Sequence, residues 1–108
     1  MSRHRQNRHH TIRATTFDKR GRIISTAFNS YVTTHPLQAK LAKKVGMPAC
    51  QFLHAEISAL IKARGRKVYK IFVERYDSQN NPKTAAPCKI CAEALELYGV
   101  ERIEYTIG

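Results

Sequence analysis

The strongest constraint on the fold is a pair of short motifs, which can bind one metal ion only if the chain brings them together. The first motif is His-Ala-Glu at residues 54–56, and the second is Pro-Cys-Lys-Ile-Cys at residues 87–91. Cys88 and Cys91 are three residues apart, so on a helix their side chains share one face. The amino end of a helix also favours the thiolate form of cysteine. The two motifs therefore predict a fold in which the starts of two distant helices lie side by side.

The donor atoms of these motifs suit zinc. His54 supplies an imidazole nitrogen, and Cys88 and Cys91 supply two thiolates. Three protein ligands leave one tetrahedral position to water, as in catalytic zinc sites, and zinc lowers the pKa of that water to about 7. Glu56 cannot easily bind the same ion together with His54, but it can reach the bound water and move its protons. We therefore predict Zn²⁺ as the cofactor, held by these three ligands, with Glu56 as the catalytic residue.

Each motif alone has other interpretations. A Cys-x-x-Cys pair also occurs in structural zinc sites and in redox sites, and a His-x-Glu pair on a helix is often only a solvated or capping pair. Cys50 and His35 stand near the first motif. Either could add a fourth ligand, which would close the site and abolish catalysis, although a buried cysteine and a loop histidine are the plainer interpretations. The combination of both motifs in this order favours the catalytic site.

The hydrophobic pattern predicts an α/β fold. Two strands at residues 11–17 and 22–28 are expected to form a hairpin around Asp-Lys-Arg-Gly at residues 18–21. The remaining predicted elements are helices at residues 36–45, 51–63 and 88–98 and strands at residues 68–76 and 100–107. Because a helix separates the last two strands, they should be parallel neighbours.

The length allows one domain, predicted at residues 11–108, behind a flexible basic arm at residues 1–10 that is nearly all polar. The formal net charge is +11, and residues 1–55 hold ten Lys and Arg against one Asp. Such a charge attracts polyphosphate partners, although it can also serve solubility alone.

The remaining composition bears on location. Three cysteines do not make a disulfide framework, and no apolar run approaches the roughly 20 residues that cross a membrane. The amino end also lacks the apolar stretch of a signal peptide. We therefore predict a cytoplasmic protein with no membrane partner.

Together the two motifs resemble the signature of the cytidine and deoxycytidylate deaminase superfamily, and the resemblance covers about residues 11–107. It implies a three-layer α-β-α fold with a mixed sheet of about four strands, in a minimal version. The linker at residues 30–36 is most similar to small phage-type members. The implied activity is attack of zinc hydroxide on the amine-bearing ring carbon of a cytosine nucleotide, with deoxycytidylate as the first candidate.

The resemblance also implies substrate contacts. Asn29 follows the second predicted strand, where relatives have an asparagine that contacts the sugar, although an asparagine there can also simply make a turn. In relatives, the amine of the substrate lies against two backbone segments. These segments correspond here to the backbone at Ala55 and Ala86. A core this small further implies a homo-oligomer in which a second subunit completes the pocket.

Two alternative functions remain open at this stage. The same chemistry could act on cytosine or adenine in single-stranded DNA or RNA, which the basic charge favours, although few aromatic residues accompany the basic ones. The chain could also be a non-enzymatic module that zinc stabilises. Glu56 argues against that module, because a structural zinc site has no need of its carboxylate.

Overall fold

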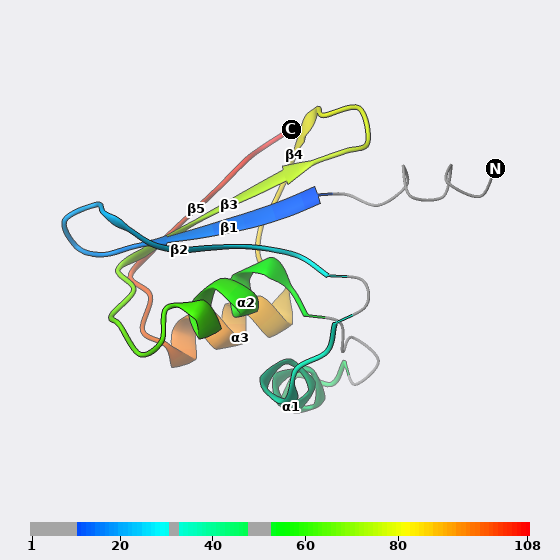
Figure 1. Cartoon of the computed structure of the whole chain (residues 1–108). Helices are drawn as coiled ribbons and strands as arrows, with labels where there is room; N and C mark the ends of the chain where they lie inside the picture. The colour runs from blue at the N-terminus through cyan, green and yellow to red at the C-terminus, as the bar shows by residue number, and fades with distance from the viewer. Residues whose placement is uncertain (1–10, 31–32, 48–52) are drawn as a thin grey trace.

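The computed structural model describes residues 11–30, 33–47 and 53–108, in which three helices lie on one side of a mixed β-sheet (Figure 1). The flexible arm predicted at residues 1–10 lies outside these residues. None of the helices in the described ranges is long and apolar enough to cross a membrane.

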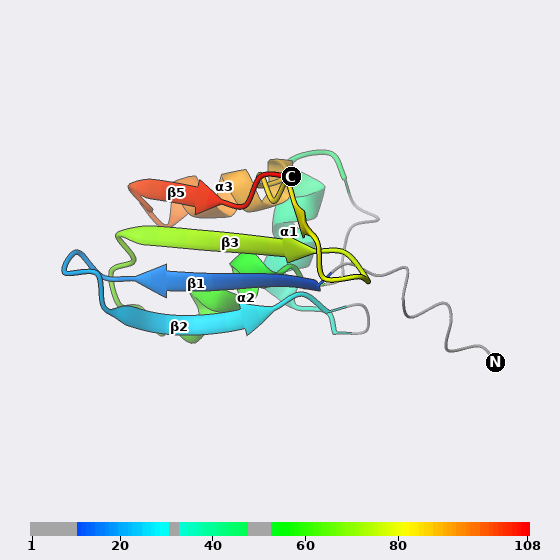
Figure 2. The ribbon, with the colours of Figure 1, turned by 90° about the horizontal axis from the view of Figure 1, so that it is seen from above.

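The sheet is built around a central strand, as Figure 2 shows from above. β1 (Thr11–Phe17) pairs antiparallel with β2 (Ile23–Phe28) on one edge and with β3 (Lys70–Tyr76) on the other. The far edge of β3 pairs with two further strands, the short β4 (Pro82–Lys83) and the parallel β5 (Arg102–Tyr105). The predicted hairpin and the parallel pairing of the last strands are thus confirmed.

The turn of the hairpin is held by an aspartate. Asp18 Oδ1 accepts hydrogen bonds from the backbone N–H groups of Arg20 and Arg22, each at 2.9 Å. Gly21 has a φ of +83°, a left-handed conformation that costs glycine little and other residues more. The local sequence therefore suffices to reverse the chain between β1 and β2.

The three helices are α1 (Pro36–Lys44), α2 (Ala55–Lys62) and α3 (Lys89–Leu97). The apolar faces of α2 and α3 pack on the sheet, and the largest fully buried apolar side chains are Ile57, Leu60, Ile71, Ile90 and Leu95. Burial of each such side chain contributes about 1.5–3 kcal/mol. The core therefore fixes α2 and α3 next to each other under the sheet.

Polar groups also join the hairpin to α2. Ser25 Oγ donates to the carbonyl oxygen of Ala59 at 2.7 Å and lies 2.6 Å from Thr16 Oγ1. Because these side chains are buried, their hydrogen bonds are shielded from competition with water. They fix α2 relative to β1 and β2.

The fold differs from the expectations in several boundaries. The second helix is predicted at residues 51–63, with His54 inside it, but it begins at Ala55, so His54 is its N-cap. Residues 51–52 lie outside the described part. The predicted strands at 68–76 and 100–107 are shorter, and β4 was not predicted. The α/β class and the mixed sheet are confirmed, but within the described residues all helices lie on one side, so those residues supply no third layer.

Candidate metal centre

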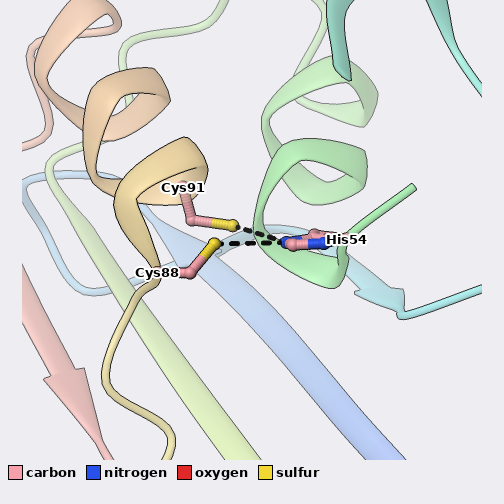
Figure 3. Close-up of side chains that lie close together, drawn as sticks. All are labelled: His54, Cys88 and Cys91. Carbon is pink, nitrogen blue, oxygen red and sulfur yellow. Dashed lines mark hydrogen bonds between the residues drawn. The ribbon is translucent and has the colours of Figure 1, made fainter. Parts of the chain in front are cut away.

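Three donor atoms from two distant segments converge between the starts of two helices, as Figure 3 shows. His54 Nδ1 lies 3.2 Å from Cys91 Sγ and 3.5 Å from Cys88 Sγ. All three ligand atoms lie within 4.8 Å of one another. The predicted convergence of the two motifs is therefore present in the structure.

The starts of two helices position these side chains. His54 is the N-cap of α2 and Cys88 is the N-cap of α3, and neither side chain makes a capping hydrogen bond with its helix. Cys91 follows in the first turn of α3 and is fully buried. Because the N–H groups of a first helical turn carry partial positive charge, both helices direct a favourable field at thiolates and anions.

The backbone around His54 is held from α1 and from the end of β2. The N–H of His54 donates to Gln38 Oε1 at 3.3 Å, and Gln38 is fully buried in α1. The N–H of Ser30, just after β2, donates to the carbonyl oxygen of Leu53 at 3.0 Å. The orientation of His54 therefore depends on two elements outside the motif that contains it.

Gln38 was missed by sequence reasoning, which assigned it no role. A signal for its burial was present, because Gln38 stands three residues before Leu41 and four before Ala42. That spacing places it on the apolar face of α1. An amide on such a face needs a buried partner, and the backbone of His54 supplies one.

The two thiols share their protons unequally. A hydrogen bond from the Cys91 thiol lowers the pKa of Cys88 to about 4, with further help from the hydrogen bond to His54. The same hydrogen bond raises the pKa of Cys91, and burial adds to that effect. The hydrogen bond to Cys88 also raises the pKa of His54, although burial opposes it. The hydrogen bonds within the cluster therefore favour the thiolate form of Cys88 over that of Cys91.

Glu56 lies in the first turn of α2 beside this cluster, and only 6% of it is exposed. Burial raises the pKa of its carboxyl, while its own backbone N–H and the charge of His54 oppose the shift. The carboxyl also interacts with the thiol of Cys91. A carboxyl so placed can both take up and release a proton in the site.

The donor set fits zinc. Tetrahedral zinc with Zn–N and Zn–S bonds of about 2.1 and 2.3 Å requires N···S separations of about 3.6 Å. The separations of 3.2 and 3.5 Å from His54 Nδ1 to the two sulfur atoms are close to that requirement. One imidazole and two thiolates are also characteristic zinc donors.

Two residues, His35 and Cys50, were considered above as possible fourth ligands of the metal. His35 is the N-cap of α1, and its Nδ1 accepts a hydrogen bond from the N–H of Leu37 at 3.0 Å. The cluster of metal-binding side chains in the described residues does not include it. Cys50 lies outside the described residues.

The predicted substrate contacts lie around the same region. Asn29 exchanges hydrogen bonds with Ile12, since its Oδ1 accepts from the N–H of Ile12 and its own N–H donates to the carbonyl oxygen there, each at 3.0 Å. The bond from Ser30 to Leu53 joins this end of β2 to the segment before His54. Ala55 is fully buried at the start of α2, and Ala86 is exposed two residues before Cys88.

Comparison with known proteins agrees with this geometry. A family model described as the cytidine and deoxycytidylate deaminase zinc-binding region matches residues 1–107. No match to a curated protein was found.

Proposed function

Because the chain belongs to the cytidine and deoxycytidylate deaminase zinc-binding family, we propose that it deaminates a cytosine nucleotide hydrolytically, with deoxycytidylate as the first candidate. Zinc is its cofactor. The observation that supports the proposal most strongly is the cluster of His54, Cys88 and Cys91 with the buried carboxyl of Glu56 beside it.

In this proposal His54 Nδ1 and the Sγ atoms of Cys88 and Cys91 hold the ion and leave one coordination position to a small ligand. Zinc, when bound, acidifies water and so supplies a nucleophile near neutral pH. The two helix starts keep the ligands in place, and the buried core beneath them resists their displacement. The chain thus contributes a preorganised site in which little has to move during the reaction.

Glu56 moves the protons. Its carboxylate takes one proton of the attacking water and delivers it to the ring nitrogen. It then takes the remaining proton of the added hydroxyl and delivers it to the amine, which leaves as ammonia. Burial raises its pKa, so Glu56 binds each of these protons more readily than a solvated carboxylate before it passes the proton on. Its fixed position in the first turn of α2 keeps it within reach of both proton acceptors.

The substrate contacts are proposed from the position of β2 relative to the site. Asn29 binds the sugar, and the backbone of Ala55 and Ala86 borders the amine. The bonds of Asn29 to Ile12 support this role, because they hold the asparagine in place at the end of β2. Asn29→Ala should therefore raise KM for nucleosides and nucleotides and leave the zinc content unchanged. Unchanged kinetics on every such compound would mean that Asn29 only stabilises the end of β2 and does not contact the sugar.

The role of Glu56 is tested by comparing two variants with the parent protein. Glu56→Ala should retain zinc and lose turnover of deoxycytidylate, cytidine, deoxycytidine and cytidylate, because the carboxylate moves protons without binding metal. Cys88→Ser should lose zinc as well as turnover. Ammonia release and metal analysis measure the two properties. Full activity in Glu56→Ala would disprove the mechanism, and equal zinc loss in both variants would make Glu56 a ligand.

A second candidate substrate is cytosine or adenine in single-stranded nucleic acid. It is favoured by the net charge of +11. Salt separates the two candidates, since six to ten backbone contacts would lower affinity about 10³- to 10⁵-fold between 50 and 200 mM salt, whereas one phosphate group costs far less. Turnover of oligonucleotides but not mononucleotides, with steep salt dependence, would replace the first candidate.

The proposed oligomer is supported by apolar side chains on and beside β5. Exposed side chains there include Leu97, Tyr98, Ile103, Tyr105 and Ile107, the last of them 78% exposed. Burial of such a patch against a second subunit would stabilise an assembly. Analytical ultracentrifugation of the full chain measures the assembly directly.

A further inference from the structure

The end of the molecule farthest from the metal centre is strongly basic. Three segments form it: the β1–β2 turn at residues 18–22, the end of α2 with the following loop at residues 62–70, and residues 99–104 before and within β5. Together these segments contain nine Lys and Arg against three Asp and Glu. We call them the basic end. In Figures 1 and 2 it lies at the left, opposite the start of α2.

Hydrogen bonds hold the three segments together. The N–H of Tyr69 donates to the carbonyl oxygen of Phe17 at 2.9 Å, and the N–H of Arg102 donates to the carbonyl oxygen of Tyr69 at 3.0 Å. Lys67 Nζ donates to the carbonyl oxygen of Gly99 at 2.6 Å. The concentration of positive charge is therefore a property of the fold, not only of the sequence.

Most of this charge is available to a partner. Asp18 pairs with Arg22, and Glu104 pairs with Lys70 and Arg102. The salt bridges between described residues include none of five exposed cations, which are Lys19, Arg20, Lys62, Arg64 and Arg66. The carboxyl end of α2 attracts the cations nearest to it, but that effect fades within one turn and does not explain the cations of the β1–β2 turn.

A hollow lies among these segments. It has a volume of about 110 Å³ and is lined by both aromatic and charged residues, which are Phe17, Asp18, Lys19, Gly21, Tyr69, Lys70, Arg102 and Glu104. Lys70 Nζ stands 4.6 Å from the centre of the Phe17 ring. Cations that surround an aromatic-lined hollow are the combination with which proteins bind single-stranded nucleic acid. A planar guanidinium also binds phosphate through two hydrogen bonds at once.

We propose that the basic end binds the backbone of single-stranded nucleic acid and forms a surface separate from the metal centre. The eight residues of α2 rise about 12 Å between the two regions, so the residues of the basic end are not those of the metal centre. The proposal does not depend on which nucleotide is deaminated. A single strand is favoured over a duplex because an unpaired base can enter the hollow, whereas a paired base cannot.

The test compares two charge-matched variants of the full chain. Arg20→Gln with Arg66→Gln removes two cations of the basic end, and Lys40→Gln with Lys43→Gln removes two exposed cations of α1. Binding to a fluorescent 20-nucleotide oligothymidylate is measured by anisotropy at several salt concentrations. The arginine variant should bind more weakly and lower the slope of log K against log salt by about 1.4, at ~0.7 for each lost contact. The lysine variant should keep the slope of the parent protein.

Several results would overturn the proposal. Equal losses in the two variants would mean that the charge acts diffusely, and equal binding of a 20-base-pair duplex would exclude the single-strand preference. Binding to phosphatidylserine vesicles without binding to the oligonucleotide would assign the surface to membranes instead. Turnover of deoxycytidylate by the arginine variant should match that of the parent protein. A parent protein without turnover would contradict the proposed function and leave the binding result intact.

Discussion

Replacement of Ser25 by alanine should destabilise the domain by more than the loss of one exposed hydroxyl. Ser25 Oγ donates its only proton to the carbonyl oxygen of Ala59, so Thr16 must be the donor in the 2.6 Å contact between the two hydroxyls. Thr16 is fully buried. Without Ser25, the hydroxyl of Thr16 loses its acceptor and stays away from water.

The magnitude follows from these partners. A buried donor without an acceptor costs about 1–3 kcal/mol. The carbonyl oxygen of Ala59 contributes less, because it also accepts from the N–H of Ala63 at 3.1 Å. We therefore expect Ser25→Ala to lower the free energy of unfolding by about 2 kcal/mol, which for a domain of this size lowers Tm by roughly 8–16 °C. The helix that positions Glu56 would be held less firmly.

Urea unfolding, followed by circular dichroism at a fixed zinc concentration, measures this change. Thr16→Val is the matched control, since it removes the donor and leaves the bond from Ser25 to Ala59 in place. The double variant should cost clearly less than the sum of the single ones, with a coupling energy of about 0.5–3 kcal/mol. The reasoning would be refuted by strict additivity, or by a cost of Ser25→Ala below about 0.5 kcal/mol.

Two further predictions concern charged groups away from the metal centre. Arg13 makes two hydrogen bonds of 2.8 Å with the largely buried carboxylate of Glu74, so Arg13→Ala should cost about 1–3 kcal/mol in urea unfolding, and Arg13→Lys should recover only part of it. An unchanged unfolding midpoint in Arg13→Ala would contradict this prediction. The backbone N–H of Asn81 lowers the pKa of Asp77, so the stabilisation from its charge is present above pH 4, roughly its unfolded pKa, and disappears as the pH falls through the lower folded value. The difference in Tm between the parent and Asp77→Asn should therefore be larger at pH 7 than at pH 3, and an equal difference at both would argue against it.

The order of the main elements could be predicted because local signals agree with the fold. Alternating apolar residues and Gly21 define the hairpin. The apolar stripe of α2 and the β-branched and aromatic run of β3 define the helix under the sheet and the strand that follows it. β4 was not predictable, since two residues that begin with proline carry no strand pattern. The starts of α2 and α3 were also hard to predict. Their N-cap residues are His54 and Cys88, which are not among the residue types that usually cap helices.

The convergence of His54 with Cys88 and Cys91 was predictable from the spacing and chemistry of the two motifs. The contribution of Gln38 was not, because it depends on a backbone contact between segments that no local pattern connects. The basic end was only partly visible in the sequence for the same reason. Its charges come from three separated segments, which hydrogen bonds at Tyr69 and Lys67 bring together.

The attachment of the ligands to helix starts makes the chain unequally tolerant of insertions and deletions. Residues added to the surface turns between Lys62 and Cys88 need not move the metal ligands. His54 is held at the start of α2 and Cys88 at the start of α3, so each keeps its place in its own helix. Between Cys88 and Cys91, one added residue would rotate the second thiol by about 100° and carry it away from His54. Length variation among natural or engineered relatives should therefore concentrate in the connections and leave that three-residue spacing unchanged.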